Sequence, residues 1–167
     1  MALEDPEIPE SLRINNRQPD QDFDDPNERL FRAFPKKDWP VNETNLHLLV
    51  DIPQNCTARQ RYCENEADVL YTVRLSKSEA VVVPFIVGWI RELDLSGDLA
   101  KAIEVSEIFL RIVHCPENDF YPHTEVRTVD SEGSLFVVPG GKKVAKTNRR
   151  VLRRLISRCA DLEGCSP

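Results

Sequence analysis

The sequence lacks the short motifs that mark the common catalytic and cofactor-binding sites. It has no Gly-x-Gly-x-x-Gly, no Walker loop, no His-Glu-x-x-His, no Gly-x-Ser-x-Gly and no Cys-x-x-Cys pair. The familiar dinucleotide-binding, nucleotide-hydrolysing and serine hydrolase classes therefore have no support. The sequence predicts no catalytic residue, no bound metal and no cofactor.

The sequence also has no long hydrophobic run. The most apolar stretch, residues 80–90, is shorter than the roughly 18 residues that a membrane span requires, and Arg91, Glu92 and Asp94 follow it at once. The N-terminus is acidic and has no apolar signal core. We expect a cytoplasmic protein that does not engage a membrane.

The cysteines do not form a recognisable framework. There are 5 of them, an odd number, and their spacings match no disulfide scaffold, so we expect free thiols in a reducing cytosol. A zinc site built from Cys56, Cys63, Cys159 and Cys165 is a weak alternative, because zinc knuckles normally separate paired cysteines by two to four residues. Buried or loop thiols fit better.

The most informative feature that is present is a reversal of charge near the C-terminus. The chain has 28 acidic and 22 basic residues and a net charge of −6. Residues 142–158 nevertheless carry no acid and eight bases: Lys142, Lys143, Lys146, Arg149, Arg150, Arg153, Arg154 and Arg158. One short segment is thus opposite in charge to the rest, which indicates a contact surface for an acidic partner.

The same segment has the periodicity of a two-faced helix. At 100° per residue the basic side chains share one half of the helix, and an apolar half faces the other way. The apolar set is Val144, Ala145, Val151, Leu152, Leu155, Ile156 and Cys159. Because Pro139-Gly140-Gly141 breaks the preceding strand-like segment, we expect a helix over 142–160 that docks through its apolar half. A plain solvated surface helix is the simpler alternative.

The N-terminus has the opposite composition. Residues 1–30 hold nine acids, three bases and four prolines, and such a stretch buries little apolar surface. We therefore expect residues 1–28 to form a disordered or loosely docked acidic arm. Its charge makes it a candidate to fold over the basic helix and compete with an outside anion.

The middle of the chain reads as one α+β domain over residues 29–160, followed by a short tail, 161–167. We expect about five mostly antiparallel strands with two or three helices, ending in the basic amphipathic helix. The expected strands are residues 30–34 (or a single helical turn), 46–52, 69–75, 105–113, 123–129 and 134–138. A helix is favoured over 78–93 with Pro84 in its first turn, a short helix over 96–103, and a polar loop over 53–68.

Two loops carry reactive side chains. Between two expected strands, His114, Cys115 and His123 lie with two carboxylates in a polar loop, where a zinc site or a thiol–imidazole pair is conceivable, although the spacing is not diagnostic. Arg59 and Arg61, with Tyr62, form a small cationic patch that suits an anion or plain solvation.

These features favour a non-catalytic binding or adaptor protein, a subunit or accessory factor of a larger complex. It would engage an acidic protein surface through Lys142, Lys143, Lys146, Arg149, Arg150, Arg153 and Arg154. The first alternative is an accessory protein that binds nucleic acid through the same helix, which the net charge of −6 disfavours. The second is a small metal- or thiol-dependent enzyme that uses the His114–His123 loop.

Overall fold

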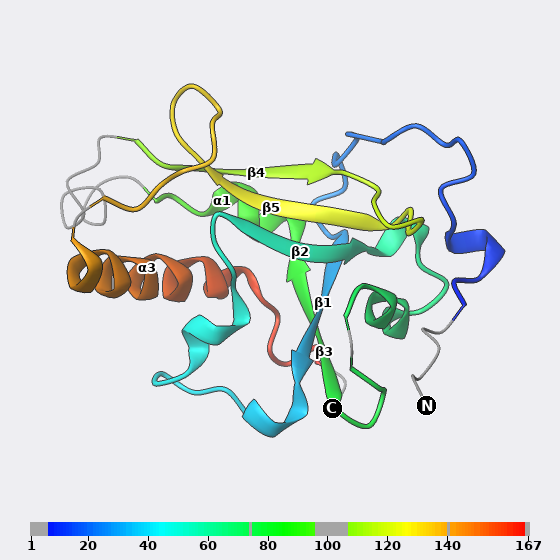
Figure 1. Cartoon of the computed structure of the whole chain (residues 1–167), viewed down its shortest axis with the longest axis horizontal. Coiled ribbons are helices and arrows are strands. Elements are labelled where there is room, and N and C mark those ends of the chain that lie inside the picture. The colour runs from blue at the N-terminus through cyan, green and yellow to red at the C-terminus, as the bar shows by residue number, and fades with distance from the viewer. Residues whose placement is uncertain (1–6, 74, 96–106, 140, 166–167) are drawn as a thin grey trace.

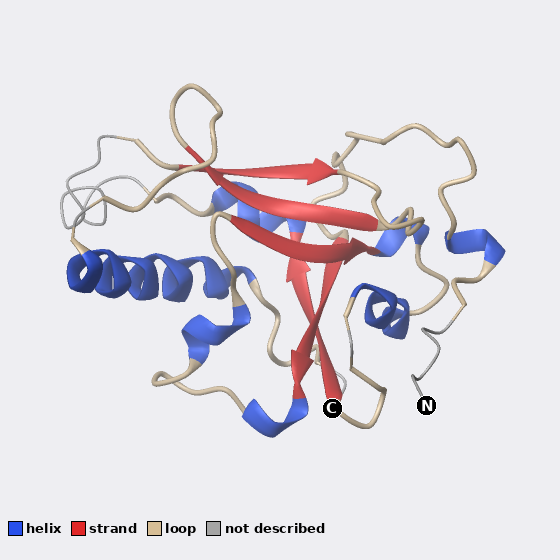
Figure 2. Cartoon of the chain, in the orientation of Figure 1, coloured by secondary structure: helices blue, strands red, loops and turns tan. Residues whose placement is uncertain are grey.

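A single antiparallel sheet of five strands, in the order β3-β1-β2-β5-β4, organises the chain (Figures 1 and 2). The computed structural model describes residues 7–73, 75–95, 107–139 and 141–165. The strands are β1 (Arg29–Pro35), β2 (Gln54–Arg59), β3 (Ala80–Ile86), β4 (Phe109–His114) and β5 (His123–Val129). The predicted α+β class with about five antiparallel strands is confirmed.

Two α-helices and several short 3-10 segments complete the described elements. The α-helices are α1 (Val87–Glu92) and α3 (Lys142–Ile156). The 3-10 segments are η1 (Glu10–Leu12), η2 (Lys36–Asp38), η3 (Leu46–Leu49), η4 (Gln60–Tyr62), η5 (Glu66–Thr72) and η6 (Ser157–Cys159). None of the helices in the described ranges has the length and apolar character needed to cross a membrane.

The sheet has two halves joined by a short seam. β1 pairs with β3 along seven residues, but it pairs with β2 only through Leu30↔Arg59 and Phe31↔Ala58. In Figure 1, β2, β5 and β4 run along the molecule whereas β1 and β3 run across it, so the sheet is strongly twisted. Whatever holds the ends of β1 and β2 together therefore holds the two halves together.

The larger hydrophobic core fills one face of the sheet. Leu30, Val83 and Phe85 from the strands meet Leu152 and Ile156 of α3 there. On the opposite face a smaller cluster gathers around Phe31 and Val82. Since β1 and β3 contribute alternate residues to the two clusters, this half of the sheet is apolar on both faces.

The segment from 78 to 93 differs from the predicted helix, because Pro84 lies inside β3 and only α1 is helical. The amide of Asp161 donates to the Pro84 carbonyl at 2.8 Å, so this carbonyl points away from β1. The nitrogen of a strand residue points to the same side as its carbonyl, which places the missing N–H of Pro84 on the outer edge, where it costs no pairing within the sheet. Ala160 forms a bridge to Phe85 and covers that edge.

Other local predictions also differ from the structure. The expected strand 46–52 contains the 3-10 segment η3, and η5 overlaps the first half of the expected strand 69–75. η5 starts with a capping box between Asn65 and Asp68. The expected strand 134–138 forms only an isolated bridge, from Leu135 to Val129. The strand β2 lies instead within the expected loop 53–68. Its inward side chains are polar, so no apolar alternation marks it. The expected short helix at 96–103 lies outside the described residues.

The described part of the acidic arm, residues 7–28, packs against the domain. Leu12 and Phe23 are buried, and the Tyr121 amide donates to the Leu12 carbonyl at 2.8 Å. In Figure 1 this blue segment lies at the opposite end of the molecule from the first turns of α3. The structure thus has a docked segment where the sequence indicated disorder or loose docking, and it does not lie on the basic helix.

Arg59, the last residue of β2, anchors this segment. Its guanidinium is fully buried and donates from Nε to Glu28 Oε1 at 2.7 Å and from Nη2 to Glu28 Oε2 at 3.1 Å. It also donates to the carbonyl of Asp20 at 2.6 Å and to that of Asp22, and it stacks on the Phe23 ring with 3.9 Å between Cζ and the centroid. A buried charge is tolerated only when paired and hydrogen-bonded in this way.

We predict that Arg59→Met destabilises the fold by about 3–5 kcal/mol, because it leaves the Glu28 carboxylate buried and unpaired. The free energy of unfolding in urea measures this. Arg91→Met, at an exposed arginine of α1, is the control and should change stability by less than about 0.5 kcal/mol. Adding Glu28→Met should recover part of the loss. Equal stability of the Arg59 and Arg91 variants would contradict this account.

Candidate functional site

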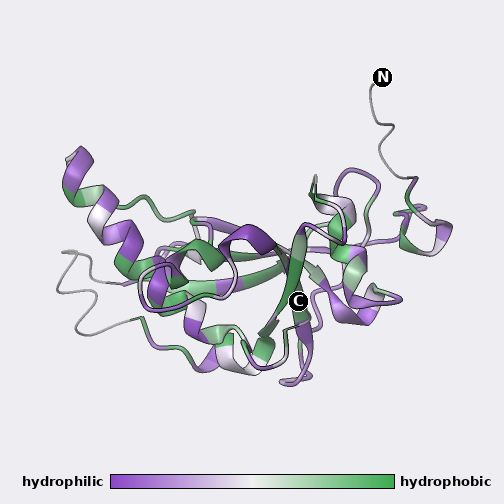
Figure 3. Ribbon diagram, turned by 90° about the horizontal axis from the view of Figure 1, so that it is seen from below, coloured by the Kyte–Doolittle hydropathy of each residue, from purple (hydrophilic) through white to green (hydrophobic). Residues whose placement is uncertain are grey.

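The basic helix α3 is fixed to the domain at its C-terminal end. Leu152 and Ile156 are buried in the larger core, and Cys159 follows them in η6. Ala145 is the only residue of the first two turns that is buried. Figure 3 shows α3 extending out from the body, with its first turns farthest from the sheet. The helix predicted over 142–160 is therefore present, continuing as η6 to Cys159.

Two of the predicted binding residues make contacts within the chain. Arg153 donates to the Val50 carbonyl and lies 3.5 Å from the Asp51 carboxylate, and Arg154 donates to the Glu43 carbonyl. Both side chains are partly buried against the segment around η3. They stabilise the docked half of the helix, so they are less available to a partner than the sequence indicated.

The remaining five predicted binding residues are exposed. They are Lys142, Lys143, Lys146, Arg149 and Arg150. Among the residues that the structure describes, none of the five has an ion-pair partner within 4.0 Å. We call these five side chains the basic surface.

Besides burial, the positive charge of α3 contributes to the lowered pKa of His47 in η3. Its pKa is lowered first by burial and then by the nearby Arg150, Arg153 and Arg154. Each of these effects disfavours the imidazolium form.

His114, one of the candidate catalytic groups, has a structural role. Its Nδ1 accepts the Asp20 amide at 2.8 Å, and its Nε2 donates to the Tyr121 carbonyl at 2.7 Å. The ring stacks on Tyr62 at 5.3 Å between centroids. Burial lowers the pKa of His114, so the neutral ring holds the arm to the sheet and both of its nitrogens are already used.

The other half of that loop does not form a reactive thiol pair. Cys115 Sγ lies 3.5 Å from His123 Nδ1, but this nitrogen donates to the Cys115 carbonyl at 2.8 Å. Burial raises the pKa of the Cys115 thiol to about 12. A nucleophilic cysteine needs a lowered pKa, so the thiol–imidazole alternative loses its chemical basis.

The structure brings metal-ligand groups together in a combination that the sequence did not indicate. The sites considered from the sequence, with four cysteines or with His114 and Cys115, do not assemble in the described parts of the chain. Cys56, His123 and Glu125 do, with ligand atoms all within 4.8 Å of one another. Their separation in sequence hid this group, because only the pairing of β2 with β5 makes them neighbours.

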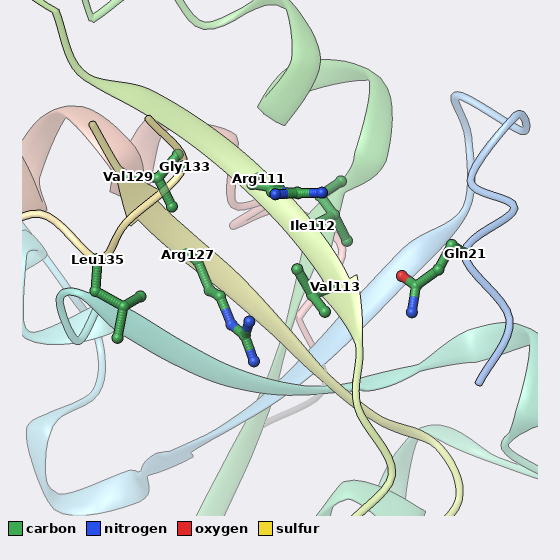
Figure 4. Close-up of a pocket in the computed structure, with 8 residues that line it drawn as sticks. All are labelled: Gln21, Arg111, Ile112, Val113, Arg127, Val129, Gly133 and Leu135. Atoms are coloured by element: carbon green, nitrogen blue, oxygen red, sulfur yellow. The ribbon is translucent and has the colours of Figure 1, made fainter. Parts of the chain in front are cut away.

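A pocket lies on the face of β4 and β5 to which the Glu125 side chain also projects (Figure 4). It is lined by Gln21, Arg111, Ile112, Val113, Arg127, Val129, Gly133 and Leu135. Arg111 and Arg127 stand opposite each other on neighbouring strands. No histidine, cysteine or carboxylate lines it, so it offers no acid, base or nucleophile.

The cationic patch at Arg61 and Tyr62 already holds an anion from its own chain. Asp20 lies 3.2 Å from Arg61 and accepts a hydrogen bond from the Tyr62 hydroxyl. Asp22 lies 3.5 Å from Arg61. The carboxylates of the acidic arm neutralise this patch rather than the basic surface.

Taken together, fold and site define an α+β domain with a projecting, uncompensated basic helix and no assembled catalytic constellation among the described residues. Comparison of the chain with protein-family models, with curated proteins and with solved structures finds no match.

We predict that acid weakens the fold partly through Asp20. The Tyr62 hydrogen bond, with the Asp22 amide and the arginines, lowers the pKa of Asp20 from 3.8 to about 2. The unfolded chain then binds this proton more readily, so the stabilisation is complete above about pH 4 and is lost as the pH falls towards 2.

Tyr62→Phe should therefore flatten the fall in unfolding free energy between about pH 4 and pH 2, measured by urea titration at each pH. Tyr71→Phe, at a tyrosine whose ring packs at a tilt against Phe120, is the matched control and should keep the wild-type slope. The same slope in all three proteins would show that the Asp20–Tyr62 contact does not govern acid stability.

Proposed function

We propose that this chain is a non-catalytic adaptor or accessory subunit that binds an acidic protein partner through the basic surface of α3. The observation that supports the proposal is that the basic side chains at the two ends of α3 differ in their contacts. Arg153 and Arg154 are used within the chain, whereas the five side chains nearer the N-terminus are exposed and unpaired with described residues. This surface has the charge that an acidic partner requires.

Exposed apolar side chains beside the basic surface favour a protein over nucleic acid. Val144 is 56% exposed and Val151 is 40% exposed, and a spacing of seven residues places them on one side of the helix. Valine gives no advantage against a phosphate backbone, whereas protein interfaces combine apolar contacts with a polar rim. The net charge of −6 also repels a polyanion at long range.

The partner implied is an acidic segment that carries apolar side chains among its carboxylates. Its carboxylates would pair with the basic surface, and its apolar groups would cover Val144 and Val151. The first turn of α3 has no acidic residue and no side-chain cap, so its free amide groups add to the positive potential there. A cytoplasmic location and membership of a larger complex belong to the same proposal.

We predict that Lys142→Glu/Lys143→Glu/Lys146→Glu abolishes partner binding and leaves the fold intact. Acidic residues near a helix N-terminus stabilise the helix, so lost binding cannot be attributed to unfolding of α3. Lys36→Glu/Lys37→Glu/Lys77→Glu makes the same change of charge at exposed lysines elsewhere and is the matched control. Tagged proteins are used to recover partners from native lysate, with and without nuclease.

An acidic protein recovered in stoichiometric amount by the wild type and the control, but not by the α3 variant, is the expected result. Recovery that is unchanged by the α3 substitutions would exclude the basic surface as the binding site. Material that is lost on nuclease treatment would replace this proposal with the nucleic-acid alternative, whose affinity falls steeply with salt.

A further inference from the structure

Three metal-ligand side chains share one face of the β2–β5 pair. Cys56 stands directly opposite Glu125, and His123 precedes Glu125 by two residues, so all three side chains project to the same side of the sheet. Their ligand atoms lie within 4.8 Å of one another. Ligand atoms around one tetrahedral zinc ion lie about 3.3–3.8 Å apart, so small side-chain rotations suffice to close this group around an ion.

The imidazole of His123 is oriented for metal binding. Its Nδ1 donates to the Cys115 carbonyl at 2.8 Å, which leaves the lone pair of the neutral ring on Nε2. A backbone carbonyl that fixes the tautomer in this way is the usual outer partner of a metal-bound histidine. The ring is buried, so it keeps this orientation without a ligand.

The carboxylate of Glu125 is held in the same manner. Arg127 Nε donates to Oε2 at 2.6 Å, and Gln54 Nε2 donates to the same oxygen at 3.2 Å. Both contacts use Oε2, and no described residue donates a hydrogen bond to Oε1. One oxygen is therefore anchored and the other is available as a ligand.

Glu117 supplies a fourth group. Its Oε1 lies 3.3 Å from His123 Nε2, and its side chain is 53% exposed. This separation is also that of two ligand atoms on one tetrahedral zinc ion. The loop position of Glu117 lets its side chain adjust to such an ion.

We propose that Cys56, His123, Glu125 and Glu117 bind one zinc ion. Sulfur, nitrogen and oxygen together suit a borderline ion such as Zn²⁺, whereas Mg²⁺ and Ca²⁺ require all-oxygen sites. Cys56 Sγ, His123 Nε2, the Glu125 Oε1 and a Glu117 oxygen are the ligand atoms. The ion links β2 to the loop that joins β4 and β5.

Binding exchanges a proton for the metal. Burial and the neighbouring Glu125 raise the pKa of the Cys56 thiol, so the metal-free side chain is protonated at neutral pH. Zn²⁺ displaces that proton to solvent and forms the sulfur–zinc bond.

The test is titration of the metal-free full chain with Zn²⁺ by calorimetry, and with Co²⁺ by absorption. We expect one ion per chain, a Co²⁺–thiolate charge-transfer band, a higher melting temperature with Zn²⁺, and reversal of all three by a chelator. Cys56→Ser, at an exposed position, should weaken Zn²⁺ binding at least about 100-fold and remove the band. Glu117→Gln should weaken binding at least about 10-fold.

Cys165→Ser, at a half-buried thiol outside the group, is the matched control and should bind as the wild type does. Circular dichroism checks that each variant is folded. A wild-type chain without the charge-transfer band would overturn the proposal. So would a Cys56→Ser chain that binds with unchanged affinity, or a band that persists in Cys56→Ser and disappears in Cys115→Ser.

Discussion

The buried ion pair between Arg59 and Glu28 is the interaction on which the arrangement of this chain depends. Arg59 ends β2 and Glu28 directly precedes β1, so the pair closes the short seam between the two halves of the sheet. A desolvated guanidinium requires acceptors at fixed positions, and the carbonyls of Asp20 and Asp22 supply the rest. The Arg59 side chain thus both holds the acidic segment on the domain and links the two halves of the sheet.

Because the described part of the acidic segment pairs with arginines of the domain, it does not neutralise the basic surface of α3. Asp20 and Asp22 pair with Arg59 and Arg61 at one end of the molecule, while the basic surface lies at the other end (Figure 1). The carboxylates that the sequence offered as an internal competitor for α3 are therefore engaged elsewhere. An uncompensated positive field of this kind would accelerate encounter with the acidic partner that we propose and would fix its orientation.

The sequence predicted the class of the fold, β5 and the terminal helix, because these follow from apolar periodicity or from strong chain breaks such as Pro139-Gly140-Gly141. It missed β2, whose inward residues Asn55, Thr57 and Arg59 are polar. Thr57 and Arg59 bond to partners far along the chain, whereas Asn55 accepts the amide of the nearby Asp51. The group formed by Cys56, His123 and Glu125 was missed for the same reason. Residues that meet only through strand pairing leave no local pattern, and an arginine that will be fully buried has the same letter as a solvated one.

Amide hydrogen exchange on the intact wild-type chain tests the central claim most directly, at the backbone amides of Asp20 and Tyr121. These two amides donate to His114 Nδ1 and to the Leu12 carbonyl, each at 2.8 Å, and both depend on docking of residues 7–28. If Arg59 fixes this segment as part of the fold, their protection should approach that of the β1 and β5 amides. Exchange of both amides at the rate of an unstructured chain, with the strands protected, would contradict the account.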